Sequence, residues 1–120
     1  MSIESAVESI YQKKMKVEEF SGFSEQEFEK FLAKQRGIID TSNEIILDAF
    51  AKRVEAAKKV AIAKKIVNAP LFMPQREEEI LTNAVEYSKK IGIDAELGKE
   101  IIAFILTKAR EIQDRYYSTL

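Results

Sequence analysis

Two positively charged residues interrupt the apolar stripe of the longest helix that the sequence predicts. The apolar positions of this stripe are separated by steps of three and four residues or their sums: Ile39, Ile46, Ala49, Ala57, Val60 and Val67. Arg53 and Lys64 fall on the same stripe. They are close to three helical turns apart, which separates them by about 16 Å along the helix axis. Because burying an unpaired charge is costly, we expect an anion between them, either a carboxylate of the protein or a bound ligand.

The composition predicts an ordered, all-α chain. Of its 120 residues 46% are hydrophobic, whereas only four are Gly and two are Pro. This length is typical of a single domain with a modest core. The formal net charge is −1, so there is no electrostatic reason to expect a nucleic acid as partner.

Two residue types are missing from the sequence, and their absence limits the chemistry. The chain has no Cys and no His, so it offers no thiol nucleophile, no disulfide, no imidazole proton shuttle and few zinc ligands. We therefore expect neither a metal nor a cofactor. The sequence has no run of about 18 apolar residues and opens with no signal peptide. It predicts a cytoplasmic protein without a membrane partner.

The long helix is predicted to begin at Ser24 and to run to about Asn68. Ser24 and Glu27 have the spacing of a capping box, which satisfies backbone N–H groups at a helix N-terminus. Thr41 and Glu44 have the same spacing. The main alternative is therefore a helix that breaks near residue 40.

Two shorter helices follow, and a short one precedes. Pro74 is typical of a first helical position, Gly92 of a helix C-terminus and Asp94 of an N-cap. They predict helices over about 74–91 and 95–117. Residues 1–23 are predicted to be a helical extension of a domain over 24–120. Because the two shorter helices cannot cover the whole stripe of the long one, we expect an intertwined homodimer.

Two further polar residues are candidates for the same site. Gln113 follows Ala109 by four residues on the apolar face of the last helix, where a buried amide needs partners. The alternative is a helix-end glutamine that reaches solvent. Arg36 lies seventeen residues before Arg53, or about 25 Å along the axis, and a quarter turn around it. In a two-fold dimer, Arg36 of one subunit would reach the site of the other.

These residues together resemble the all-α chorismate mutases, over residues 33 to about 117. The resemblance lies in the spacing of an Arg-x-x-Ile-Asp segment, three further basic residues, an acid and an amide. In this chain they are Arg36 to Asp40, Arg53, Lys64, Arg76, Glu77 and Gln113. The resemblance implies a long helix and two shorter ones in an intertwined dimer, with chorismate as the substrate and prephenate as the product.

The resemblance also implies roles for the basic residues and the amide. Arg36 of the partner subunit and Arg53 would hold the two carboxylates of chorismate. Lys64 would contact a carboxylate and the ether oxygen, and Gln113 would donate to that same oxygen. The reaction is an intramolecular rearrangement, so it needs conformer selection and stabilisation of the ether oxygen rather than a nucleophile or a metal.

The start of the helix predicted over 74–91 supplies the remaining two roles that the resemblance implies. Glu77 would accept a hydrogen bond from the ring hydroxyl, and Arg76 would help to hold the corner between loop and helix. The sequence departs from the family at Met73, which is often acidic there, and at Ala109, which is a Ser in some members.

Two other functions compete with this interpretation. An isochorismate–pyruvate lyase has the same scaffold, but such enzymes tend to lack the acid that Glu77 supplies here. The second alternative is a non-catalytic helical interaction module. In that case Arg53 and Lys64 would pair with acids of their own chain, for which Glu44 and Glu77 are the candidates.

Overall fold

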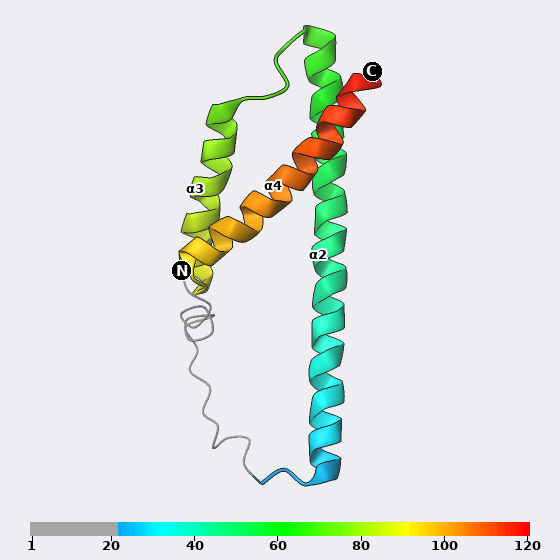
Figure 1. Ribbon diagram of the computed structural model, residues 1–120, viewed down its shortest axis with the longest axis vertical. Helices are drawn as coiled ribbons and strands as arrows, with labels where there is room; N and C mark the ends of the chain where they lie inside the picture. Colours follow the sequence, from blue (N-terminus) through cyan, green and yellow to red (C-terminus); the bar gives the residue numbers. More distant parts are fainter. Residues whose placement is uncertain (1–21) are drawn as a thin grey trace. The chain divides into compact units, whose positions relative to one another are not determined.

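A computed structural model of the chain describes residues 22–120. These residues form the helices α2 (Glu25–Val67), α3 (Pro74–Ile91) and α4 (Ala95–Ser118) and contain no strand. This arrangement is drawn in Figure 1 and confirms the all-α fold class. The helix predicted over residues 2 to about 19 lies outside the described residues. No helix within residues 22–120 combines the length and the apolar character that crossing a membrane requires.

Helix α2 begins and ends where the sequence predicts. The Ser24 hydroxyl accepts a hydrogen bond from the Glu27 N–H at 3.2 Å and donates one to the Glu27 carboxylate at 3.1 Å. The helix ends at Val67, and Asn68 adopts a left-handed conformation with φ of 55°. The structure does not contain the alternative break near residue 40, because α2 is continuous there.

Helices α3 and α4 are bounded by local signals of the same kind. Pro74 is the first residue of α3, and Gly92 follows it with φ of 82°, a left-handed conformation that Gly adopts without strain. The Asp94 carboxylate accepts a hydrogen bond from the Leu97 N–H at 2.9 Å and so caps α4. The predicted ends of both helices are confirmed to within a residue or two.

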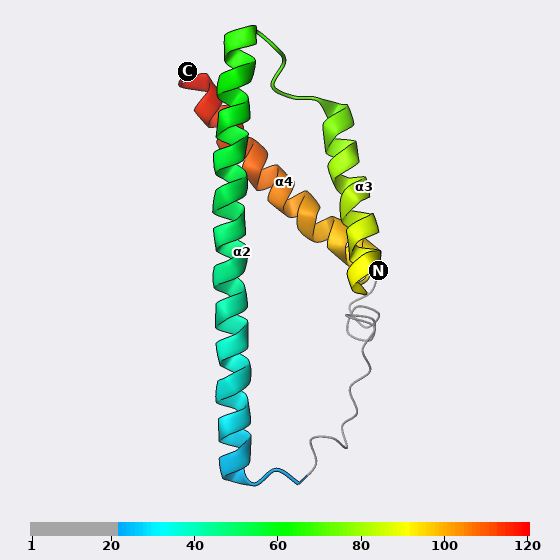
Figure 2. The same cartoon turned by 180° about the vertical axis from the view of Figure 1, so that it is seen from behind.

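The described residues divide into two compact units, 22–52 and Arg53–Leu120, which we call the N-terminal and C-terminal regions. In the C-terminal region α3 packs against α4, and both views show the two helices side by side where they are joined (Figures 1 and 2). Gly98 and Ser88 are buried at this contact. A Cβ on Gly98 would come within 1.8 Å of the Ser88 hydroxyl oxygen, so only glycine permits the observed approach.

The N-terminal region leaves its aliphatic side chains exposed in the single chain. Ile45 and Leu47 expose 62% and 67% of their surface, and Ile39 and Ile46 of the predicted stripe each expose 57%. A helix with this many apolar side chains along one stretch normally packs them against another surface. The intertwined homodimer that would cover them stays a prediction.

Candidate active site

The C-terminal region contains a cavity of about 280 Å³ between α2, α3, α4 and the loop that joins α2 to α3. Its wall combines apolar residues, such as Val60, Ile80 and Leu106, with four basic and two acidic side chains. The charged residues are Arg53, Lys64, Arg76, Arg110, Glu77 and Asp114. With basic groups in excess, the cavity favours an anionic ligand.

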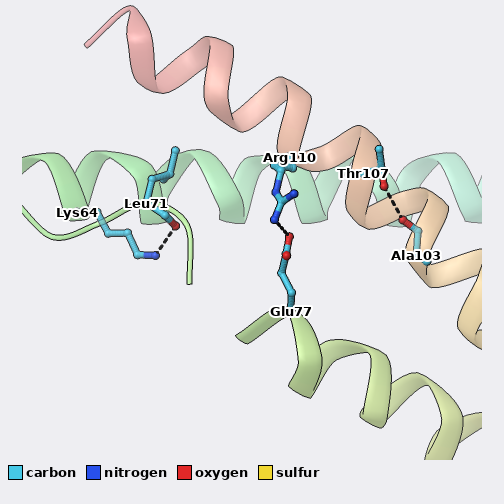
Figure 3. A network of polar contacts seen from close by, with 6 residues as sticks. All are labelled: Lys64, Leu71, Glu77, Ala103, Thr107 and Arg110. Atoms are coloured by element: carbon cyan, nitrogen blue, oxygen red, sulfur yellow. Dashed lines mark hydrogen bonds and ion pairs between the residues drawn. The ribbon is translucent and has the colours of Figure 1, made fainter. Parts of the chain in front are cut away.

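Lys64 lies in the last turn of α2 with its side chain half-buried. Its ammonium group donates a hydrogen bond to the backbone carbonyl of Leu71 at 2.8 Å, as Figure 3 shows. Lys64 therefore holds the loop between α2 and α3 against the helix. An ammonium group has three N–H donors, so two remain for a ligand.

Arg53 lies three turns before Lys64 and is also half-buried. Burial and, secondly, the positive charge of Arg76 lower the pKa of Arg53. Among residues 22–120, no carboxylate forms an ion pair with Arg53 or Lys64. An anion in the cavity would relieve the repulsion between Arg53 and Arg76 and would compensate the burial of Arg53.

Gln113 lies on α4 and reaches across to α2. Its side-chain amide donates a hydrogen bond to the Ala57 carbonyl at 2.9 Å. The interpretation of Gln113 as a residue that reaches solvent at a helix end is therefore wrong. The hydrogen bond fixes the amide at the cavity wall and occupies one of its two N–H donors, so the second is available to a ligand.

The two candidates at the start of α3 have separate partners. Arg76 forms an ion pair with Glu79 one turn further along α3, and its side chain is largely exposed. Glu77 forms an ion pair with Arg110 of α4. Glu77 is thus not the partner of Arg53 or Lys64 that the interaction-module hypothesis requires.

Arg110 is a charged residue of the cavity that the sequence analysis missed. It lies four residues after Leu106 and three before Gln113, on the stripe of α4 that lines the cavity. The spacing that marks Arg53 and Lys64 on α2 therefore marks Arg110 on α4 as well. The same criterion, applied to the last helix, would have found it.

Arg36 stands apart from the other candidates. It belongs to the N-terminal region, its side chain is exposed, and it is not among the residues that line the cavity. Five of the six candidates therefore line one cavity, and a role for Arg36 requires the predicted second subunit.

Comparison with known proteins identifies the family of this chain. A family model described as chorismate mutase type II matches residues 35–114, about two-thirds of the sequence. The chain belongs to this family. The match confirms the resemblance drawn from the spacing of the basic residues, and it covers α3 and most of α2 and α4.

Similar proteins include three with informative names. A T-protein of Enterobacter agglomerans is 24% identical over 90 residues, which are 74% of this chain and 24% of the relative. A 4-amino-4-deoxychorismate mutase of Streptomyces pristinaespiralis is 23% identical over 84 residues, 70% of this chain and 65% of the relative. A chorismate mutase of Methanocaldococcus jannaschii is 29% identical over 85 residues, 71% of this chain and 86% of the relative. No solved structure matches the chain significantly.

Proposed function

We propose that this protein is a chorismate mutase of aromatic amino-acid biosynthesis, which converts chorismate to prephenate. The observation that carries the proposal is the cavity of the C-terminal region. There, Arg53 and Lys64 have no carboxylate partner among the described residues, and the Gln113 amide lies in the same wall. Chorismate carries two carboxylates and an ether oxygen, which match these groups in charge and in hydrogen-bonding capacity.

In the proposed mechanism the basic residues select the reactive conformer. Arg53 and Arg36 of the partner subunit each bind one carboxylate, because a planar guanidinium donates two parallel hydrogen bonds to a carboxylate. Holding both carboxylates brings the two ends of the rearranging system together. The enzyme thereby removes conformational entropy before the reaction begins.

Lys64 and Gln113 are proposed to act on the bond that breaks. As the C–O bond of the ether lengthens and the new C–C bond forms, negative charge develops on the ether oxygen. Each side chain is held by a backbone carbonyl, Leu71 for Lys64 and Ala57 for Gln113, and each keeps at least one N–H donor free. One such fixed donor is typically worth about 3 kcal/mol in the transition state.

The site is proposed to be complete only in a homodimer. Arg36 lies outside the cavity, and the aliphatic side chains of the N-terminal region are exposed. A two-fold dimer along α2 would bury those side chains and would supply Arg36 to the partner's cavity. We further propose that residues 24–120 form the mutase domain and that residues 1–23 extend it. The cytoplasmic location stays a prediction.

The substrate has two candidates that differ in one ring substituent. Chorismate has a hydroxyl where 4-amino-4-deoxychorismate, the compound in the name of the Streptomyces relative, has an amine. Glu77 is the proposed acceptor for this substituent. Its carboxylate is already paired with Arg110, and a paired carboxylate favours the neutral hydroxyl.

The decisive experiment is to incubate the purified chain with chorismate and to measure prephenate formation. We expect turnover without an added metal or cofactor. An isochorismate–pyruvate lyase would instead release pyruvate from isochorismate, so the same preparation is assayed with that compound. An interaction module would consume neither substrate.

A further inference from the structure

A guanidinium group is held at the side of the cavity where α3 faces α4. The Nη2 atom of Arg110, which solvent does not reach, forms an ion pair with Oε1 of Glu77. Figure 3 shows the two side chains pointing toward one another from α4 and α3. The Glu77 side chain is 26% exposed and the Arg110 side chain 41%, so water screens this pair only in part.

A second contact fixes the position of Arg110. Its guanidinium carbon lies 4.1 Å from the centre of the Phe72 ring, a favourable cation–π geometry. Phe72 belongs to the loop that Lys64 holds through the Leu71 carbonyl. Arg110 is therefore held between a carboxylate of α3 and an aromatic ring of the loop.

The ion pair changes what Glu77 can bind. A carboxylate has several acceptor positions, so Glu77 can accept a hydrogen bond from a hydroxyl while it remains paired with Arg110. Its negative charge, however, is compensated by the adjacent guanidinium. A cationic group beside Glu77 would gain little from the carboxylate and would be repelled by Arg110.

We propose that Arg110 is a specificity-determining residue, which makes the cavity select a neutral hydroxyl over an ammonium group at the ring position that Glu77 contacts. The inference rests on the function proposed above, since it assumes that the ring substituent of the substrate reaches Glu77. It assigns chorismate as substrate and 4-amino-4-deoxychorismate as the compound that the cavity discriminates against. An aliphatic amine is protonated near neutral pH, so the two compounds differ in charge at this position.

The remaining charged groups of the cavity belong to all three helices. They are Arg53 and Lys64 on α2, Arg76 on α3 and Asp114 on α4. Like Arg110, the three basic groups repel an ammonium group in the cavity, whereas the carboxylate of Asp114 attracts it. The selectivity must therefore be measured as the ratio of kcat/KM for the two compounds. Ionisations of the enzyme that affect both compounds equally cancel in this ratio.

The test is the ratio of kcat/KM for chorismate to kcat/KM for 4-amino-4-deoxychorismate. We expect the unaltered chain to favour chorismate and Arg110→Met to lower the ratio at least about tenfold, because the repelling charge is removed. Arg110→Lys should keep most of the ratio, since it keeps the charge. The matched control is Arg115→Met, on the exposed part of α4 and outside the cavity, which should leave the ratio unchanged.

A second measurement needs no variant and tests the charge selectivity that the inference requires, so the inference can still be overturned if Arg110→Met does not fold. In the unaltered chain, the preference for chorismate should fall at least about tenfold as the pH rises from neutral through the pKa of the amine. The ring double bond and the neighbouring ether oxygen place this pKa below the value of about 10.4 for a lysine amine. A ratio that stays constant with pH, or that is unchanged in folded Arg110→Met, overturns this inference while chorismate turnover upholds the proposed function. A chain that neither binds nor converts chorismate overturns both.

Discussion

Helix α2 runs through both regions of this molecule, but its surroundings differ between them. In the C-terminal region one face of α2 lines a cavity together with α3, α4 and the connecting loop, and the polar groups Lys64 and Gln113 have backbone partners, although Ile66 and Val67 of α2 remain exposed. In the N-terminal region, Ile45 and Leu47 are largely exposed and Arg36 lines no cavity. The C-terminal region contains most of the residues proposed for catalysis. The N-terminal region has an exposed apolar surface that the proposed second subunit would bury.

Among substitutions that compare the two regions, the largest loss of turnover is expected at Lys64. The variant Lys64→Ala should lower chorismate turnover at least a hundredfold, or about 3 kcal/mol, because it removes a donor to the ether oxygen in the transition state. The measurement is kcat/KM, with circular dichroism to verify the helical fold. Lys59→Ala is the matched control, because Lys59 is exposed on α2 and pairs only with Glu55 among the described residues. Turnover close to that of the unaltered chain would contradict the assignment of Lys64.

Gln113→Glu should produce a comparable loss at neutral pH that acidification reverses. The introduced carboxyl can donate a hydrogen bond to the ether oxygen only when it is protonated, below its pKa of about 4.3 in water. Activity should therefore be present at acidic pH and should be lost as the pH rises through this pKa. The measurement is the pH profile of kcat/KM, with Gln75→Glu, outside the cavity, as the control. A flat profile in Gln113→Glu would count against the role of the amide.

The contribution of the N-terminal region is tested by mixing two inactive variants. Arg36→Ala and Lys64→Ala should each be inactive alone. If Arg36 acts on the partner's cavity, half of the dimers in an equal mixture are mixed dimers with one intact site of two, so about a quarter of the activity returns. The measurement is turnover after joint refolding.

The control for this mixing experiment is Lys64→Ala with Gln113→Ala. Both residues belong to the cavity of one subunit, so no mixed dimer has an intact site and no activity should return. If the mixture of Arg36→Ala and Lys64→Ala also stays inactive although the subunits exchange, Arg36 does not act across a dimer.

The smallest effects are expected from two glycine substitutions that compare packing in the two regions. Gly98→Ala should destabilise the chain by about 1–3 kcal/mol, because the new methyl group would collide with Ser88. Gly37→Ala meets nothing within 4 Å and should stabilise helix α2 by about 0.5–1 kcal/mol. Urea denaturation measures both changes. Equal effects of the two substitutions would mean that the contact between α3 and α4 is looser than described.

The helix boundaries were predictable because each depends on groups close together in sequence. The Ser24 hydroxyl, the Asp94 carboxylate and Gly92 each act on backbone groups within four residues. The one open question was the second capping box near residue 40. The helix does not break there, because a continuous helix keeps its interior backbone hydrogen bonds, whereas a break would leave those backbone groups without helical partners.

The candidate site was predictable only in part. The periodicity of α2 marked Arg53 and Lys64, and the same criterion on α4 would have marked Arg110. Their partners were not predictable, since the Leu71 carbonyl, Glu77 and Phe72 come from other elements. For the same reason the sequence left Glu77 open as a partner of Lys64.

The sequence by itself determined three helices, their ends and the basic residues that lie on apolar stripes, because helical periodicity and capping act over a few residues. Only the tertiary structure decided which groups satisfy one another. It placed Glu77 beside Arg110 rather than Lys64, and it left Arg53 with no carboxylate partner among the described residues. Such pairing depends on how distant elements approach, and the close packing that Gly98 permits between α3 and α4 helps to set that approach.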